Sequence, residues 1–320
     1  MASVKRRQSS SFFRKAIIAL ALLTGFVYLP LYISYDEVNK SKNGFSTVTL
    51  IDHLKLADGE NVTKAFASYG YNLNEIKNGD AEVPNLFLEK LPRELTTLKD
   101  AAVRKELFIS SLLPPILKVN EFILYERSKL LEIVRSIELN GQATTNDLYW
   151  LRRKMLRYRM DNFNIEELYS RMNIIPPSLA LTQAAIETGW GSSRFAQEAN
   201  ALYGQWTWSD DDGVVPLGRR EGETHSVKKF ENLISAVEGY ALNLNTHEAY
   251  ADFRLERSKF ATPEDIKVYD LLITLIFYSE QGYEYIDNLN NIINVNGLGQ
   301  FDNVRLKNNS LQEIRLDPAP

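Results

Sequence analysis

One segment, residues 176–196, combines a single carboxyl group with an otherwise apolar helix pattern. Its sequence, PPSLALTQAAIETGWGSSRFA, begins with Pro177 and Ser178, residue types that favour the first turn and the cap of a helix. Leucine, alanine and isoleucine then occupy nearly every face, a pattern that predicts a buried helix. Glu187 is the only ionisable residue of this helix, which we expect to end at Gly189.

The position of Glu187 predicts a raised pKa for its carboxyl group. Burial among alanine and isoleucine side chains disfavours the charged form, and the negative end of the helix dipole acts in the same direction. A carboxylic acid that is protonated near neutral pH can donate a proton to the leaving oxygen of a glycosidic bond. The alternative is a structural Glu that is bonded to backbone amides. The residues around Glu187 are therefore needed to distinguish a catalytic from a structural role.

The residues that follow Glu187 favour the binding of a sugar. Small residues (TG-GSS) would let a substrate approach closely, and the stretch NALYGQWTW contains Tyr203, Trp206 and Trp208 within six positions. Aromatic rings pack against the C–H faces of pyranoses. We therefore expect these three rings to form an exposed wall for sugars, although at least one of them is expected to lie in the core.

At this point the sequence resembles a known family. The stretch ALTQAAIETGWGSSRFAQEANALYGQWTW is similar to the core motif of the flagellar and autolysin-type peptidoglycan endo-β-N-acetylglucosaminidases, and more closely to their Bax-like branch. The likeness continues in HSVKKFENLISAVEGYALNLNTHEAYADFR and YSEQGYEYIDNLNNII, and in total it covers roughly residues 95–298.

The resemblance implies a mainly α, lysozyme-like fold with a small β-lobe, which the residues themselves place near 205–230. It also implies acid catalysis by Glu187, with Tyr278 in the same cleft, and glycan strands of peptidoglycan as the substrate. No metal or organic cofactor is required. Two rival functions share these residues: a muramidase or lytic transglycosylase, which cuts the other glycosidic bond, and a wall-binding scaffold without hydrolytic activity.

The second catalytic group is less well defined by the sequence. Glycosidases usually pair the acid with another carboxylate. Glu223 is the first candidate and Glu221 the second, whereas the run Asp210–Asp212 favours a solvated turn. The N-acetyl group of the substrate, or a water held by Tyr278, could instead take this role.

Two further residues are candidates for binding the substrate. Asn245, beside Asn243 and His247, could bond to sugar hydroxyls or N-acetyl groups, or could equally close a helix. Tyr250 could reach the cleft or simply anchor the same helix. Glu280 has the context of a helix end or loop, and we do not expect it to be catalytic.

Composition excludes several other classes. The 320 residues carry a net charge of −4, so a basic face for nucleic acid is not expected. The absence of cysteine excludes thiolate metal sites and thiol nucleophiles, and the three histidines lack metal-ligand spacing.

The N-terminal residues predict a membrane anchor. Basic residues precede an uncharged run, residues 16–34, which as a helix would span roughly 28 Å, close to the thickness of a bilayer core. The charge asymmetry places the N-terminus in the cytoplasm and the remaining chain outside the bacterial cytoplasmic membrane, facing the periplasm and cell wall. A cleaved signal peptide is the alternative.

Helical periodicity beyond the anchor predicts a predominantly α architecture. Pro114-Pro115 is expected to separate a helix that ends near Leu113 from one that covers about Ile116–Leu139. Thr145 is expected to cap a helix that runs to about Tyr158, and a short helix follows at 166–172. The predicted segments are an anchor (1–35), a tether (36–95), a helical region (96–172), a catalytic domain (173–300) and a tail (301–320).

Overall fold

The computed structural model describes residues 61–208, 213–215 and 226–307, and it divides them into two compact units. The first unit contains Asn120–Ile174 and Leu242–Lys267. The second contains residues 61–119, 175–241 and 268–307. Both units are mainly helical, as the sequence predicts. The segments predicted from the sequence divide the chain differently from these two compact units, and the predicted boundaries stay a prediction.

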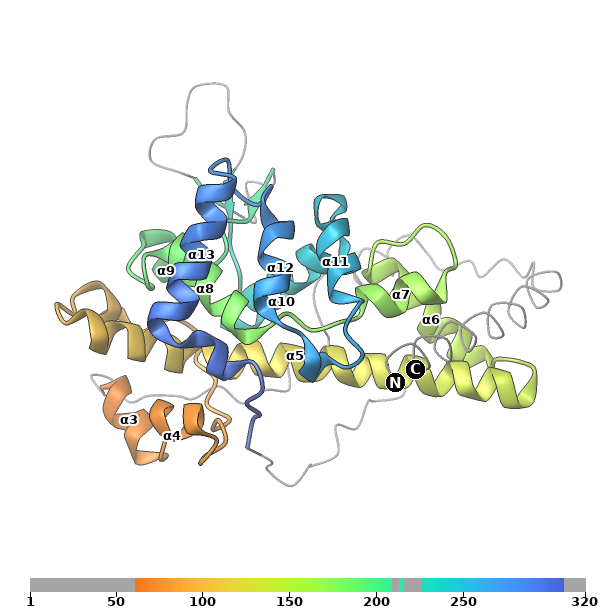
Figure 1. The fold of residues 1–320 in the computed structure, drawn as a ribbon, viewed down its shortest axis with the longest axis horizontal. Helices are drawn as coiled ribbons and strands as arrows, with labels where there is room; N and C mark the ends of the chain where they lie inside the picture. The colour runs from red at the N-terminus through yellow and green to blue at the C-terminus, as the bar shows by residue number, and fades with distance from the viewer. Residues whose placement is uncertain (1–60, 209–212, 216–225, 308–320) are drawn as a thin grey trace. The chain divides into compact units, whose positions relative to one another are not determined.

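The second unit holds the segment around Glu187. Within it, α8 packs against α13 and η6, and α12 packs against α13 (Figure 1). Its elements are α3 (Val62–Ser68), α4 (Leu73–Asn78), η2 (Arg93–Thr96), the first part of α5 (Ala101–Asn140), α8 (Pro177–Thr188), α9 (Arg194–Ala199), β1 (Trp206–Thr207), β2 (Gly213–Val214), β3 (Ser226–Lys228), most of α10 (Leu233–Thr246), α12 (Val268–Leu272), η5 (Ile273–Leu275), α13 (Tyr283–Asn296) and η6 (Leu298–Phe301).

Helix α8 is buried along nearly its whole length, as its apolar sequence predicts. Pro177 occupies its first turn, and Gly189 ends it with a φ of 57°. The expectation that Ser178 caps the helix is wrong, because Ser178 lies inside the first turn. Its backbone N–H and its hydroxyl both donate to the carboxylate of Asp302, each at 2.8 Å. Asp302 therefore supplies the acceptor at the start of α8 from a distant part of the chain.

The predicted β-like insertion is a small antiparallel sheet. Its strand order is β1-β3-β2, with Trp206 opposite Val227 and Gly213 opposite Lys228. Val227 of β3 forms a small apolar cluster with Ala199 and Ala201. The sheet thus begins within the aromatic segment that follows α9, since β1 starts at Trp206.

The first unit consists of the C-terminal part of α5 and the shorter helices that pack against it. Its elements also include α6 (Thr145–Arg157), α7 (Ile165–Arg171), the end of α10, η3 (Glu248–Tyr250), α11 (Ala251–Arg257) and η4 (Pro263–Asp265). Helix α6 lies one residue from its prediction. Its cap is Thr144, which forms a capping box with Asp147.

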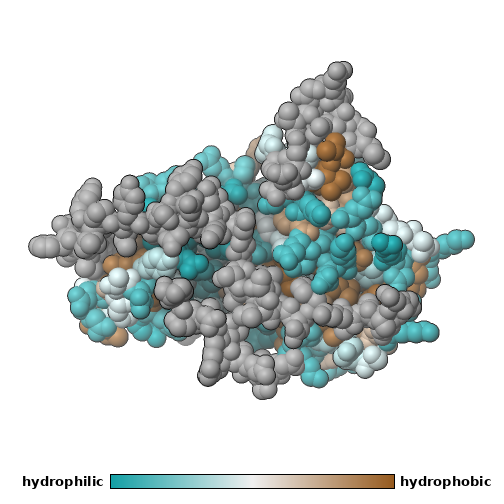
Figure 2. Space-filling view, turned by 180° about the vertical axis from the view of Figure 1, so that it is seen from behind, coloured by the Kyte–Doolittle hydropathy of each residue, from teal (hydrophilic) through white to brown (hydrophobic). Residues whose placement is uncertain are grey.

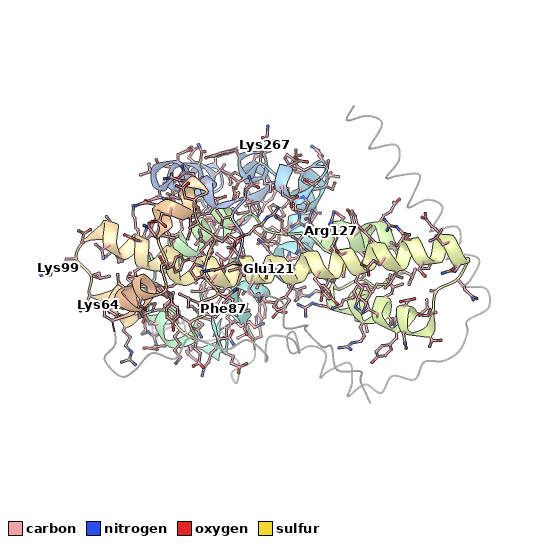
Figure 3. All side chains as sticks on the ribbon, turned by 90° about the horizontal axis from the view of Figure 1, so that it is seen from below. Lys64, Phe87, Lys99, Glu121, Arg127 and Lys267 are labelled. Carbon is pink, nitrogen blue, oxygen red and sulfur yellow. The ribbon has the colours of Figure 1, made fainter. Side chains whose placement is uncertain are left out.

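The expected break at Pro114-Pro115 is wrong, since α5 is a single helix of 40 residues (Figure 3). Neither proline has an N–H to donate to the carbonyl one turn earlier, which weakens a helix interior by ~3 kcal/mol. The flanking apolar residues, however, are almost completely buried: Leu107, Phe108, Leu112, Leu113 and Ile116. At roughly 1.5–3 kcal/mol for each large side chain, their burial outweighs the weakened turn.

The predicted anchor, residues 16–34, lies outside the described residues. Among those that are described, α5 is long and apolar enough to cross a membrane, but 83% of its most apolar stretch is buried inside the protein. Core helices of ordinary globular proteins have the same property, so α5 gives only weak support for a membrane location. Among the coloured residues visible in Figure 2, hydrophilic ones predominate.

Candidate active site

Glu187 lies in the last turn of α8, next to the glycine that ends the helix. Glu187 is exposed to solvent, whereas α8 is buried from Pro177 to Ala185. The surrounding protein nevertheless displaces enough water to raise the pKa of the Glu187 carboxyl group above its ordinary value, as the sequence predicts. An accessible carboxyl group with a raised pKa can act as a general acid toward a bound substrate.

Gly204 faces the Glu187 carboxyl group from the segment before β1. A Cβ atom added at Gly204 would lie 2.9 Å from Oε2 of Glu187, closer than real side chains approach. Its φ of 62° is also a conformation that residues with a side chain rarely adopt. Glycine at this position thus lets the backbone come close to the carboxyl group.

The turn that follows Glu187 is left-handed over three consecutive residues. Gly189, Trp190 and Gly191 have φ values of 57°, 58° and 81°, and such a value is a strained conformation for a tryptophan. Side-chain packing holds Trp190 in place, because its ring lies edge-on against Phe108 of α5 at 5.6 Å and beneath the ammonium group of Lys105 at 4.9 Å. Trp190 therefore fixes the turn on the side formed by α5.

The three predicted wall aromatics divide into two groups. Trp206 and Trp208 are exposed by 51% and 77%, as a surface for sugar rings requires. Tyr203 is only 3% exposed, and its ring stacks on Tyr240 of α10 at 3.9 Å between ring centroids. The expectation that Tyr203 offers a face to the substrate is therefore wrong, because both of its faces are covered in the core.

Tyr278 belongs to the segment between η5 and α13, and its hydroxyl donates to the backbone carbonyl of Tyr203 at 3.2 Å. Its ring stacks in parallel on Tyr285, with the ring centroids 5.6 Å apart. Since Tyr203 immediately precedes Gly204, Tyr278 is connected to the segment that faces Glu187. Its predicted place in the cleft is consistent with this contact and stays a prediction.

The candidates for a second catalytic carboxylate, Glu223 and Glu221, lie outside the described residues, as do Asp210, Asp211 and Asp212. Within the described part of the chain, no charged side chain contributes to the raised pKa of Glu187, which desolvation causes. The same part contains no cluster of three or more His, Asp or Glu residues that could hold a metal ion.

Asn245 and Tyr250 belong to the first unit rather than to the unit that contains Glu187. Asn245 is 1% exposed and donates to the backbone carbonyl of Asn173 at 2.9 Å, so the expectation that it binds substrate is wrong. Tyr250 is half-buried beside His247, whose ring nitrogen caps η3. These are contacts of helix ends, and a role of Tyr250 in binding stays a prediction.

Two residues of this site were not found from the sequence. Gly204 resembles any turn glycine there, because its approach to Glu187 depends on the tertiary fold. Gln183 gave a signal that could have been used, since it is a long polar side chain in a helix that is otherwise predicted to be buried. It lies one turn before Glu187 and is completely buried.

Part of this chain is similar to known proteins. Residues 164–298 match the family model described as mannosyl-glycoprotein endo-beta-N-acetylglucosaminidase. This segment, which includes α8, the sheet and all of α13, is similar to the glucosaminidase family. The resemblance predicted from the sequence is thereby confirmed.

A relative with a similar sequence supports the Bax-like branch of that family. The chain is 29% identical over 189 residues to the protein bax of Escherichia coli strain K12. The match covers 57% of this chain and 66% of the bax protein, just under two thirds of its length. No solved structure matches the chain significantly.

Proposed function

We propose that this protein is a membrane-anchored glycoside hydrolase that cuts the glycan strands of peptidoglycan, as an endo-β-N-acetylglucosaminidase. Glu187 is the general acid that protonates the leaving oxygen while the bond to the anomeric carbon breaks. Water then adds its hydroxyl group to that carbon, and the proton that it loses is taken up by a base and restores the protonated form of Glu187. Glu223, or the N-acetyl group of the substrate, is the candidate for the second catalytic role, and Tyr278 orients the water or the reacting ring.

One observation carries this proposal: the chain places an accessible carboxyl group with a raised pKa at the end of an otherwise buried helix, in a segment that is similar to the glucosaminidase family. A structural Glu that was bonded to backbone amides would have the opposite property, because such bonds stabilise the charged form and lower the pKa. The environment of Glu187 therefore favours proton donation over a purely structural role.

Two further features of the chain support the proposed substrate and the proposed location. Trp206 and Trp208 offer exposed rings that would stack on sugars beside Glu187. The uncharged run at residues 16–34, with basic residues before it, would hold the protein at the outer face of the cytoplasmic membrane. An enzyme anchored in this way would act on the wall that lies next to the membrane.

A second candidate function is a muramidase or lytic transglycosylase. It uses the same acid, because the desolvation that raises the pKa of Glu187 serves proton donation in either reaction. A transglycosylase needs only one catalytic carboxyl group. The two functions differ in the sugar that carries the new chain end.

Digestion of purified peptidoglycan by the full-length protein in detergent tests the proposal. The wild type is compared with Glu187→Gln and with the control Glu198→Gln, which removes an exposed carboxylate on α9 that pairs only with Arg194. The products are reduced with borohydride and analysed by mass spectrometry. We expect reduced N-acetylglucosamine ends from the wild type and the control, and a rate about 10²–10⁴-fold lower from Glu187→Gln.

Each alternative outcome has a separate meaning. Ends in reduced or anhydro N-acetylmuramic acid, still dependent on Glu187, would assign the protein to the second function. Equal rates for Glu187→Gln and the wild type would exclude Glu187 as the acid. Binding to the wall without release of fragments by any variant would favour a scaffold.

A further inference from the structure

One glutamine and four tyrosines form a connected network of hydrogen bonds and ring stacks, and this network includes two residues of the candidate site. The buried amide of Gln183 lies at its centre: the Tyr240 hydroxyl donates to Oε1, and Nε2 donates to the Tyr285 hydroxyl at 2.9 Å. Gln183, Tyr240 and Tyr285 are each at most 1% exposed. We call these residues, together with Tyr203 and Tyr278, the tyrosine–glutamine network.

The network closes on itself through the two ring stacks. Tyr240 stacks on Tyr203 at 3.9 Å, and Tyr285 stacks on Tyr278 at 5.6 Å, with both pairs of rings nearly parallel. The Tyr278 hydroxyl then donates to the backbone carbonyl of Tyr203. Tyr203 is therefore held from two directions, by its ring and by its carbonyl, and both lead back to Gln183.

Tyr203 is the residue before Gly204, whose backbone lies against the Glu187 carboxyl group. Gln183 is also on α8, one turn before Glu187. The same amide thus connects the helix that carries the acid to the segment that faces it. If the network loosened, Gly204 would move away, water would enter, and the pKa of Glu187 would fall toward its ordinary value.

The chemistry of the amide explains why this position needs glutamine. An amide accepts through its oxygen and donates through its nitrogen, so one side chain serves both tyrosine hydroxyls in fixed orientations. The hydrogen-bonded part of the network is this amide with the hydroxyls of Tyr240 and Tyr285, whereas the buried hydroxyl of Tyr203 has no partner among the described residues and Tyr203 is held by its ring and its carbonyl. Buried hydrogen bonds of this kind favour one arrangement of the groups that make them. By contrast, Thr182 on the same helix only donates to the carbonyl of Ser178, one turn earlier.

We propose that Gln183 is a positioning residue that, through Tyr240 and Tyr285 and the rings stacked on them, holds the backbone at Tyr203 and Gly204 against the acid and so sets both the rate and the pH dependence of the reaction. The inference rests on the proposed function for its kinetic part. The titration of Glu187 itself is independent of any hydrolysis.

The test compares Gln183→Met, which keeps the length of the side chain but lacks both hydrogen bonds, with Thr182→Val as a buried control on the same helix. In Gln183→Met we expect kcat to fall at least about tenfold with little change in KM, because a small misplacement of a reacting group has effects of this size. We also expect the alkaline limb of the pH–rate profile to move to lower pH. Thr182→Val should keep the wild-type values.

A second variant, Gln183→Glu, covers the case in which Gln183→Met does not fold. A protonated carboxylic acid offers one donor and one acceptor, as the amide does. The activity of Gln183→Glu relative to wild type should therefore recover as the pH falls. An activity ratio independent of pH would count against the proposal.

Carbon-13 NMR of the Glu187 carboxyl group, assigned with Glu187→Gln, separates this inference from the proposed function. If the wild type cuts no glycan, the proposed function fails, while a lower Glu187 pKa in Gln183→Met than in wild type still supports the positioning role. The inference is overturned if Gln183→Met titrates and turns over like the wild type, or if Thr182→Val changes both properties equally.

Discussion

The two units of this protein differ in the kind of polar side chain that they bury. In the second unit, the tyrosine–glutamine network is made of neutral groups and lies beneath one accessible carboxyl group. In the first unit, four arginines donate to backbone carbonyls: Arg127, Arg171, Arg254 and Arg257. We refer to these four residues as the arginine cluster.

The arginine cluster satisfies the ends of helices. Arg127 donates to the carbonyls of Tyr169 and Met172 at the end of α7, and Arg254 donates to those of Leu244 and His247 at the end of α10. The last carbonyls of a helix have no partner within the helix and carry its partial negative charge. Cationic donors are therefore well suited to these positions.

Arg257 is the extreme member, since its side chain is completely buried. Burial, together with repulsion from Arg127 and Arg254, lowers the pKa of Arg257 to about 9. Such a strongly shifted pKa is often taken as a sign of catalysis. Here its partners are the backbone carbonyls of Ser170, Asn173 and Ile174, and they explain the residue as structural. The contrast with Glu187 shows that accessibility, rather than a pKa shift alone, marks a site for chemistry.

The largest effect that we expect from this comparison is on stability. Arg257→Met leaves the backbone carbonyls of Ser170 and Ile174 without their arginine donor, and each unsatisfied buried group costs about 1–3 kcal/mol. The Asn173 carbonyl keeps its hydrogen bond from Asn245. Because the substitution also removes a buried charge, we expect a net loss of about 3 kcal/mol in the free energy of unfolding, measured by urea denaturation.

The control for this experiment is Arg194→Met, which removes an exposed arginine that pairs with Glu198 on the surface of α9. Such pairs contribute only about 0.3–0.5 kcal/mol. Activity per folded molecule should be unchanged in Arg257→Met. If Arg257→Met lost less than about 1 kcal/mol of stability, or shifted the pH–rate profile, the distinction between a structural arginine cluster and a catalytic unit would be wrong.

The second prediction concerns the backbone beside the acid. Gly204→Ala adds a Cβ atom that would lie 2.9 Å from the Glu187 carboxyl group, in a backbone conformation with φ of 62°. We expect kcat to fall about 10–100-fold, because the carboxyl group has to move away from its position. Peptidoglycan digestion at saturating substrate measures this effect.

Gly79→Ala is the matched control. Gly79 ends α4 with a φ of 81°, and an added Cβ atom would meet nothing within 4 Å. Both substitutions carry a backbone penalty of about 1–2 kcal/mol, so both variants should lose similar stability. Only Gly204→Ala should lose activity, and equal activity in the two variants would contradict the proposed contact.

The sequence predicted those parts of the fold that depend on neighbouring residues. The helix that carries Glu187 was found because its apolar residues and its terminal glycine are local signals, and the capping pattern near Thr144 was found within one residue. The single helix across Pro114-Pro115 was missed because deep burial outweighs a local helix-breaking signal there. Local rules thus failed where tertiary packing was strongest.

The same division holds for the site. The raised pKa of Glu187 followed from its position in an apolar helix. Tyr203 and Asn245 were misjudged because their partners, Tyr240 and Asn173, are far away in the sequence. An aromatic ring near a carboxyl group has the same sequence pattern whether one of its faces is free or covered. Only the fold distinguishes Trp208 from Tyr203.

The smallest expected effect concerns Asp302, the half-buried carboxylate at the start of α8. Burial raises its pKa to about 6, although the two hydrogen bonds from Ser178 act in the opposite direction. Because the folded pKa lies above the ordinary value of 3.8, the native state binds the proton more tightly than the unfolded state. The stability that this group contributes is therefore present below pH 4 and is lost as the pH rises through 6.

Asp302→Asn removes this titration. Two pKa units correspond to at most about 3 kcal/mol, and we expect the stability of wild type relative to Asp302→Asn to fall by about 1 kcal/mol between pH 4 and pH 7, as measured by urea denaturation. Ser178→Ala sharpens the test, because loss of its hydroxyl donor should raise the Asp302 pKa further and move the fall to higher pH. If the difference between wild type and Asp302→Asn grew with pH instead, the charged form would be favoured at the start of α8. The two ends of this helix would then differ, with a stabilised carboxylate at its start and a destabilised one at Glu187.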